Sequence, residues 1–281
     1  MNLPKDIKTV VQDAIDEDVS NGDITAELIM ADTRRIARVV CRDAAVLCGT
    51  AWFDETFRQL SDDCAVTWHK NDGDRLEVND IVCSLEGSAR ALVTGERTAL
   101  NFLQTLSGTA TITREYVNHL RGTKTILLDT RKTIPRLRSA QKYAVTCGGG
   151  DNHRCGLFDG ILIKENHIAA AGSIPAAITA LRAKFPDYSI EIEIESARDI
   201  DPAIAAGANM LLLDNFSIPD LRAAVEQTRA RVKLEASGGI ELEDMRAIAE
   251  TGVDFVSVGA LTKHLRAIDF SMRFLTRDRD V

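Results

Sequence analysis

The chain has 281 residues and a formal net charge of −8, with 45% hydrophobic and 27% charged residues, as in an ordinary globular protein. No apolar run approaches the roughly 18 residues that a membrane span requires, and no apolar signal core follows the first six residues. We therefore expect a cytoplasmic protein that is neither a membrane protein nor, with so acidic a balance, a nucleic-acid-binding one.

The N-terminal part of the chain predicts a mixed α+β region. Residues 5–18 carry apolar side chains at helical spacing, and residues 52–60 also predict a helix. Between residues 34 and 85, four β-branched or alternating stretches predict strands: RIARVVCR, AVLCG, AVTWHK and DIVCSLEG. Residues 89–120 return to helical composition, which we expect as two helices separated at Gly108. Arg97 lies in the first of these and by itself indicates only an exposed ion pair with Glu96.

After Gly122 the sequence alternates strand, loop and helix. The predicted strands are 125–128, 160–163, 189–194, 210–213, 232–234 and 255–258. Helices begin after Ser173, Ser196, Ser217 and Glu241. Short apolar strands that alternate with helices predict parallel pairing with right-handed crossovers.

The spacing of the strand ends suggests a barrel with fewer than eight units. Glu193, Asp214, Glu235 and Gly259 lie 21, 21 and 24 residues apart. We therefore predict an α/β fold in which an incomplete βα, TIM-like barrel over 111–261 follows a mixed α+β N-terminal domain over 1–110. A C-terminal helix over 262–281 is expected to pack back on the N-terminal domain.

Basic residues concentrate between Arg131 and Lys164, where seven Lys/Arg face two acids, so the rest of the chain carries −13. Gly148-Gly149-Gly150 and the apolar strand after Gly160 bracket these charges and place them at the mouth of a folded core. A cationic island in an acidic protein indicates a small, highly charged anionic ligand.

Polar or glycine residues end every strand of the predicted barrel, where such folds build their active sites. Glu191, Glu193 and Glu195 alternate with isoleucines, so we expect all three carboxylates on one strand face. Buried carboxylates need partners, and Lys132, Lys164, Lys233 or a divalent cation are the candidates.

Two kinds of site are thus expected at one barrel mouth. The cationic one, with Arg131, Lys132, His153, Arg154 and Lys164, suits carboxylates or phosphates. The acidic one, with Glu193 and Asp214, suits Mg²⁺ or a developing positive charge. Ser237-Gly238-Gly239 and Val258-Gly259-Ala260 offer backbone N–H groups for a phosphate. Together these sites predict a phosphorylated sugar donor and an anionic acceptor.

The six cysteines are scattered without a CxxC pair, so we expect reduced thiols. Cys147, His153 and Cys155 lie close enough in sequence to suggest a metal site, but a fourth ligand is missing.

Ordered motifs along nearly the whole chain resemble those of the quinolinate phosphoribosyltransferase family. They are GDIT at 22–25, GERTALN at 95–101, DTRKT at 129–133, QKYAV at 141–145, CGGG at 147–150, NHR at 152–154, IKENH at 163–167, LDNF at 213–216, EASGGI at 235–240 and SVGALT at 257–262. The number of matches in one order makes the resemblance highly specific.

The resemblance implies a Mg²⁺-dependent type II phosphoribosyltransferase of NAD biosynthesis. Such enzymes convert quinolinate and phosphoribosyl pyrophosphate into nicotinate mononucleotide, pyrophosphate and CO₂. The ring nitrogen of quinolinate is itself the nucleophile, so the protein need not supply one.

The resemblance also implies roles for individual residues. Arg131, His153, Arg154 and Lys164 match the positions that hold the quinolinate carboxylates, and Arg97 matches one supplied by the other subunit of a homodimer. Lys132, Glu193 and Asp214 match the catalytic positions, the two acids also serving the metal. The phosphoribosyl pyrophosphate positions are matched by Lys132, Ser237, Gly238, Gly239 and Gly259.

Two positions depart from the family pattern. Arg136 stands where glycine is common, which could alter that loop and the affinity for substrate, and Cys155 stands where an apolar residue is usual.

Three other hypotheses remain open on the sequence. A Schiff-base aldolase could use Lys164 or Lys132, although neighbouring acids would keep either lysine protonated. A paralogue of the same fold could act on a different acceptor. A phosphate-binding sensor would bind the donor without turnover.

Overall fold

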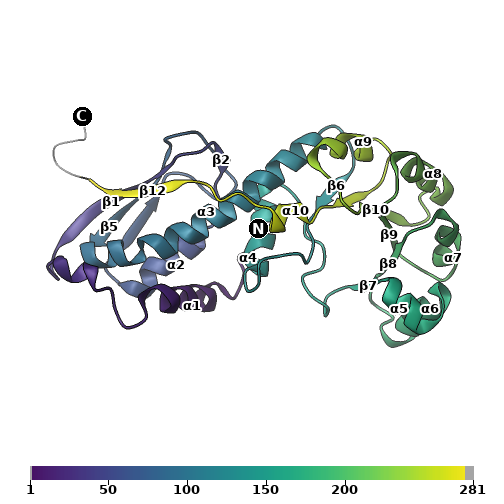
Figure 1. The fold of residues 1–281 in the computed structure, drawn as a ribbon, viewed down its shortest axis with the longest axis horizontal. Helices are drawn as coiled ribbons and strands as arrows, with labels where there is room; N and C mark the ends of the chain where they lie inside the picture. The colour runs from purple at the N-terminus through teal and green to yellow at the C-terminus, as the bar shows by residue number, and fades with distance from the viewer. Residues whose placement is uncertain (1, 276–281) are drawn as a thin grey trace. The chain divides into compact units, whose positions relative to one another are not determined.

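A computed structural model describes residues 2–275 of the chain. The described residues divide into two compact units (Figure 1). Unit 1 comprises 2–114, 134–149 and 264–275, and unit 2 comprises 115–133 and 150–263. No helix among these residues has both the length and the apolar character that crossing a membrane would take.

Unit 1 is built on an antiparallel sheet with strand order β12-β1-β5-β3. Its elements are α1 (Ile7–Val19), η1 (Thr25–Leu28), β1 (Arg34–Cys41), β2 (Ala45–Val46), α2 (Thr50–Leu60), β3 (Ala65–Trp68), β4 (Arg75–Leu76), β5 (Ile81–Ser88), α4 (Arg138–Gly148) and β12 (Phe270–Phe274). Helix α3 (Ala89–His119) begins in unit 1 and ends in unit 2. The helices predicted at 5–18 and 52–60 and the four predicted strand stretches are confirmed.

Two apolar clusters stabilise unit 1. One joins the inward side chains of β1 and β5 to α2 and α3, with Val39, Phe53 and Leu103 fully buried. The other joins α1, α2, α3 and α4, which explains why residues 134–149 belong to this unit and not to the barrel unit, where the sequence predicts them. Trp52 contributes to this second cluster and contacts Tyr143, with 5.6 Å between ring centroids.

Helix α3 is continuous, so the prediction of two helices separated at Gly108 was wrong. A Cβ on Gly108 would lie 2.3 Å from the backbone oxygen of Arg266. The glycine therefore serves a close approach of two backbones within unit 1 and does not break the helix. A single glycine costs a helix interior only about 1 kcal/mol, which packing along the rest of α3 offsets.

The C-terminal helix predicted over 262–281 was also wrong for the described residues. The short helix α10 (Ala260–Lys263) ends early, and β12 pairs antiparallel with β1. Its sequence FSMRF alternates apolar and polar residues, with Phe270 and Met272 buried, and this period of two is that of a strand. Residues 276–281 of the predicted helix lie outside the described residues.

Arg136 has a φ of +68°, in the left-handed region that glycine adopts most readily. The glycine that the family resemblance implies at this position would adopt this conformation without strain. The guanidinium pairs with Asp13 of α1, but both side chains are more than half exposed, so the pair contributes little to stability.

Unit 2 contains a six-stranded parallel sheet with order β6-β11-β10-β9-β8-β7 and helices along its outer side (Figure 1). Its elements are β6 (Ile126–Leu128), β7 (Ile161–Ile163), α5 (Glu165–Ala171), α6 (Ile174–Lys184), β8 (Ile190–Ile194), η2 (Ala197–Asp199), α7 (Ile200–Ala205), β9 (Met210–Asp214), α8 (Ile218–Thr228), β10 (Lys233–Ser237), η3 (Leu242–Asp244), α9 (Met245–Ala249), β11 (Phe255–Ser257) and α10. All six predicted strands are confirmed, as is the incomplete TIM-like barrel.

The barrel is open between β6 and β7. On the side away from its partner β11, β6 forms a parallel bridge from Leu128 to Asp151. The N–H of Asp151 donates to the carbonyl of Leu127 at 2.8 Å, and the N–H of Asp129 donates to the carbonyl of Asp151 at 3.2 Å. This bridge brings the segment after α4 to the carboxyl end of β6, where the cationic motifs lie.

Candidate active site

All but one of the expected site residues belong to unit 2, at or just after the carboxyl ends of its strands. Arg131 and Lys132 follow β6, Lys164 follows β7, Glu193 lies near the end of β8, Asp214 and Ser237 end β9 and β10, and Gly259 follows β11. Neighbouring parallel strands end at the same edge, so the sheet gathers residues that are more than a hundred positions apart. Arg97 belongs to unit 1, where it is exposed on α3.

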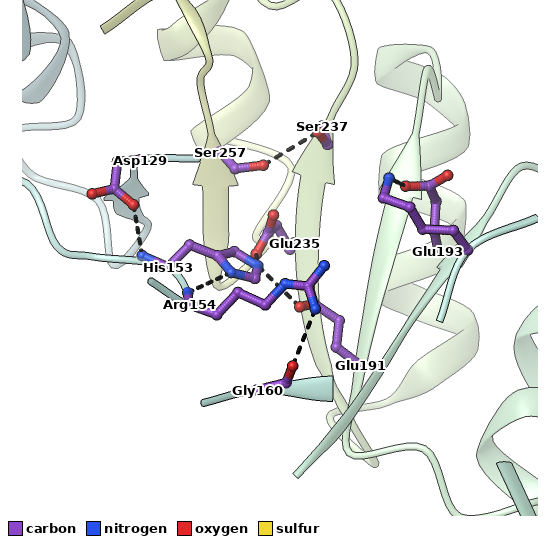
Figure 2. Close-up of polar contacts among 10 residues, drawn as sticks. Asp129, His153, Arg154, Gly160, Glu191, Glu193, Glu235, Ser237 and Ser257 are labelled. Carbon is purple, nitrogen blue, oxygen red and sulfur yellow. Dashed lines mark hydrogen bonds and ion pairs between the residues drawn. The ribbon is translucent and has the colours of Figure 1, made fainter. Parts of the chain in front are cut away.

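His153 lies against two buried glutamates from different strands (Figure 2). Its Nε2 is 2.9 Å from Oε2 of Glu191 on β8 and 3.4 Å from Oε2 of Glu235 on β10. Its Nδ1 accepts the backbone N–H of Arg154 at 2.7 Å. Both ring nitrogens are therefore directed at groups of the protein, whereas the family resemblance implies a ring that contacts a substrate carboxylate.

His153, Glu191 and Glu235 form a triad in which the pKa values of His153 and Glu191 are shifted by their neighbours. Burial lowers the pKa of His153, but hydrogen bonds to Glu191 and Glu235 outweigh it and raise that pKa to about 10. Burial and the charge of Glu235 raise the pKa of Glu191, while His153 opposes this shift. The backbone N–H of Arg154 opposes the rise in the pKa of His153, because a nitrogen that accepts a hydrogen bond must keep its lone pair; the geometry therefore favours the neutral ring, with its proton on Nε2.

Asp129 fixes the turn that carries His153. This carboxylate is fully buried at the end of β6. One oxygen accepts the backbone N–H of His153 at 2.9 Å (Figure 2). The other accepts the side-chain amide of Asn152 at 2.7 Å. Hydrogen bonds to a buried carboxylate are strong because they are charge-assisted, so the turn is held rigidly to the sheet.

Two guanidinium groups form the cationic part of the site. Burial lowers the pKa of Arg154, and the nearby charge of Arg131 lowers it further. Arg154 donates to the carbonyl oxygen of Gly160 at 3.1 Å, which directs its side chain across the start of β7 (Figure 2). Two neighbouring guanidiniums of like charge suit a dianionic ligand that would relieve their repulsion.

An acidic pair lies at the ends of β8 and β9. Glu193 forms an ion pair with Lys164. Burial raises the pKa of Asp214, and the negative charge of Glu193 raises it further, against the opposing effect of Lys164 and Lys132. Two oxygen donors that repel each other at neighbouring strand ends fit a hard cation such as Mg²⁺, which would neutralise them.

The last strand ends form a small backbone cradle. Ser237 and Ser257 lie 3.2 Å apart through their hydroxyl oxygens and connect the ends of β10 and β11. Gly238 has a φ of +96°, and its missing side chain leaves room for the backbone of Asn215. A Cβ on Gly259 would lie 3.0 Å from Cδ of Lys132, so this glycine lets the lysine side chain lie flat across it. The cradle thus combines backbone N–H groups with a lysine, as phosphate sites do.

Some of the expected partners differ. Glu193 and Lys164 pair as predicted, but Glu191 pairs with His153, which was not among its expected partners, and Lys233 pairs with Asp254. Glu191 and Glu193 share a face of β8, whereas Glu195 lies beyond the strand and is exposed.

The residues of the suggested metal site, Cys147, His153 and Cys155, belong to different units. Among the described residues, Cys147 groups with Cys48 and Asp72 in unit 1, whereas His153 groups with the two glutamates in unit 2.

Asp129, Glu191 and Glu235 are residues of this site to which the sequence assigned no role. Asp129 and Glu235 each directly follow a predicted strand, and Glu191 lies within one, on the face that the alternation predicts. Which histidine or amide each carboxylate would meet depends on the pairing of strands, which local patterns do not specify.

Comparison with known proteins agrees with this arrangement. The C-terminal domain of quinolinate phosphoribosyl transferase matches residues 109–273, and its N-terminal domain matches residues 23–107. A relative from Bacillus subtilis (strain 168), described as a probable carboxylating nicotinate-nucleotide pyrophosphorylase, is 44% identical over 91% of this chain and 89% of its own length. The carboxylating nicotinate-nucleotide pyrophosphorylase of Mycobacterium leprae (strain TN) is 40% identical over 94% of this chain and 96% of its own length.

The solved structure of the nicotinate-nucleotide pyrophosphorylase from Francisella tularensis is also similar. It is 46% identical, with a TM-score of 0.94, over 98% of each chain. Both domain models, the identity over nearly full length and the shared fold lead to one conclusion: the chain belongs to the quinolinate phosphoribosyltransferase family.

Proposed function

We propose that this enzyme transfers the phosphoribosyl group of phosphoribosyl pyrophosphate to quinolinate. The products are nicotinate mononucleotide, pyrophosphate and CO₂, and the reaction serves the synthesis of NAD. The observation that carries the proposal is the meeting of a cationic cluster, an acidic pair and a backbone cradle at one edge of the unit 2 sheet, in a chain of this family.

The cationic cluster suits the acceptor. Quinolinate carries two carboxylates, and Arg131 and Arg154 present two guanidiniums whose mutual repulsion a dianion would relieve. Lys164, at the start of α5, can add a third positive charge. Planar guanidiniums bind carboxylates in a defined orientation, so this pocket would hold the ring with its nitrogen directed at the donor.

The acidic pair and the cradle suit the donor. The backbone N–H groups of Ser237, Gly238 and Gly239 would bind its phosphate, with Lys132 beside Gly259 adding a positive charge. As the bond at the anomeric carbon breaks, positive charge develops on the ribose, and Glu193 and Asp214 would stabilise it. Mg²⁺ held by the same two carboxylates would neutralise the leaving pyrophosphate.

Decarboxylation follows from the chemistry of the acceptor. Attack by the ring nitrogen forms its bond to the anomeric carbon while the bond to pyrophosphate breaks. The pyridinium that results accepts the electron pair released when the adjacent carboxylate leaves as CO₂, and a proton then replaces it. The task of the protein here is to hold the ring in place.

The proposal also includes the partner and the setting. We expect a homodimer in which Arg97 of one subunit completes the quinolinate site of the other, because Arg97 is exposed on α3 and matches a position with that role in the family. The six cysteines are scattered without a CxxC pair, which supports reduced thiols in the cytoplasm.

The first test is product formation from quinolinate and phosphoribosyl pyrophosphate, with and without Mg²⁺ and with nicotinate as a parallel acceptor. We expect nicotinate mononucleotide and CO₂ from quinolinate alone, and loss of turnover when a chelator removes the metal. Turnover of a different acceptor would favour a paralogous phosphoribosyltransferase. Tight donor binding without turnover would favour a sensor.

The dimer is tested by mixing two inactive variants, Arg97→Ala and Lys164→Ala. If Arg97 acts in the other subunit, heterodimers contain one intact site and regain part of the activity. Heterodimers that are shown to form but remain inactive would contradict the shared site.

A further inference from the structure

The ring of His153 is held from both sides. Its Nδ1 accepts the N–H of Arg154 at 2.7 Å, and its Nε2 lies 2.9 Å and 3.4 Å from the carboxylates of Glu191 and Glu235. Its side chain is only 12% exposed. The ring therefore connects two strands of the sheet to the backbone of the next residue.

Burying Glu191 and Glu235 lowers the stability of the fold. They are 4% and 0% exposed, and neither oxygen of Glu235 has a hydrogen-bond partner of good geometry among the described residues. A buried carboxylate without hydrogen-bond donors destabilises a fold. A glutamine or an apolar residue at the same position would avoid the cost of burying the charge. Two such residues facing one histidine indicate a role other than stability.

A metal site is one interpretation of this triad, because its ligand atoms lie within 4.8 Å of one another. The direction of the hydrogen bond at Nδ1 argues against it. A histidine that binds a metal through Nε2 carries its proton on Nδ1 and donates it to an acceptor. Here Nδ1 faces the N–H of Arg154, which is a donor. The surroundings of the ring therefore favour a proton on Nε2 over a metal ion bound to it.

We propose that Glu191 and Glu235 are positioning residues for the acceptor pocket. Their carboxylates lie 2.9 Å and 3.4 Å from Nε2 of His153 and attract its proton, and so keep the ring in one tautomer and one orientation, in which Nδ1 accepts the backbone N–H of Arg154. The guanidinium of Arg154, directed by the carbonyl of Gly160, is thereby set for a substrate carboxylate. The inference rests on the proposed function for the identity of that substrate.

The acids around this turn hold different parts of it. Asp129 holds the backbone N–H of His153 and the side chain of Asn152 from the β6 side. The two glutamates hold the ring from β8 and β10. With the backbone fixed by one acid and the ring by two, Arg154 cannot turn without breaking a buried contact.

The experiment uses four variants of the full chain: Glu235→Gln, Glu235→Ala, Glu191→Gln and the control Glu226→Gln, which changes an exposed residue of α8. We expect Glu235→Ala to raise the KM for quinolinate about tenfold or more, because small misplacements of binding groups have large effects. The KM for phosphoribosyl pyrophosphate should change less than about twofold, since the cradle lies elsewhere. Glu235→Gln should restore part of the affinity, because its amide oxygen keeps a partial negative charge beside Nε2.

Stability separates positioning from a merely structural role. Removing a buried charge should leave Glu235→Gln as stable as the wild type or more stable, while its affinity for quinolinate falls. Loss of stability and of affinity for both substrates in parallel would overturn the proposal. So would an unchanged KM for quinolinate in the Glu235 and Glu191 variants of an active enzyme.

A measurement that does not depend on turnover distinguishes this inference from the proposed function. In ¹⁵N spectra of the substrate-free protein, His153 should show a protonated Nε2 and an unprotonated Nδ1, and Glu235→Ala should give a mixture of tautomers. A wild type that fails to use quinolinate would refute the function while these spectra still decide whether the acids fix the ring. A tautomer that is unchanged in Glu235→Ala would refute the inference even in an active enzyme.

Discussion

Two adjacent glycines of the proposed phosphate cradle offer a matched pair of substitutions. Gly238 and Gly239 both have positive φ values, +96° and +53°. A Cβ on Gly239 would meet nothing within 4 Å, whereas one on Gly238 would lie 2.3 Å from Oδ1 and 2.7 Å from the backbone nitrogen of Asn215. That nitrogen donates to the carbonyl of Ser237 at 3.0 Å, so it cannot move without losing a hydrogen bond.

The structure gives different costs for the two alanines. Gly239→Ala brings only the strain of a left-handed alanine, about 1 kcal/mol. Gly238→Ala adds a backbone collision, and overpacking of this kind costs about 1 to 3 kcal/mol more. We therefore expect losses of about 1 and about 3 kcal/mol in the free energy of unfolding.

Urea denaturation followed by circular dichroism measures both values, and steady-state kinetics provide the functional counterpart. Gly238→Ala should also raise the KM for phosphoribosyl pyrophosphate more than Gly239→Ala does, since it displaces the backbone of the cradle. Equal losses of stability in the two variants, or a larger loss for Gly239→Ala, would refute the reasoning from steric approach.

Two further predictions concern the core and the acidic pair. Gly108→Ala should lower the free energy of unfolding by about 2 kcal/mol, because its Cβ would collide with a backbone oxygen. Gly122→Ala has open space around it, so it should cost only the strain of a positive φ, about 1 kcal/mol, in the same denaturation assay. The amide variants of Glu193 and Asp214 should be strongly non-additive in kcat, and simple additivity in a double-mutant cycle would argue for independent roles.

The sequence by itself determined the strands of the barrel and the strand ends at which the expected site residues lie. The alternation of strand and helix after Gly122 is a local signal, and it predicted all six parallel strands. Strand ends are also local, so the amino-acid pattern alone assigns Lys164, Glu193 and Asp214 to one edge of the sheet.

Local signals failed where a distant segment decided the outcome. Gly108 looked like a helix break because the sequence does not show the backbone of Arg266 that lies against it. The C-terminal segment was predicted as a helix because its pairing partner, β1, lies more than two hundred residues earlier in the chain. Helix α4 was assigned to the barrel because the apolar cluster that it completes is formed by N-terminal helices.

The partners of the buried acids show the same limit most clearly. Alternation along β8 predicted that Glu191 and Glu193 share a face, and this was confirmed. Only the tertiary structure decided that Glu193 meets Lys164 while Glu191 meets His153, because the two contacts depend on how three strands and one turn come together. Sequence patterns specify the chemistry that each strand end offers, but hydrogen bonding is directional and short-ranged, so the assembled fold alone decides which groups meet.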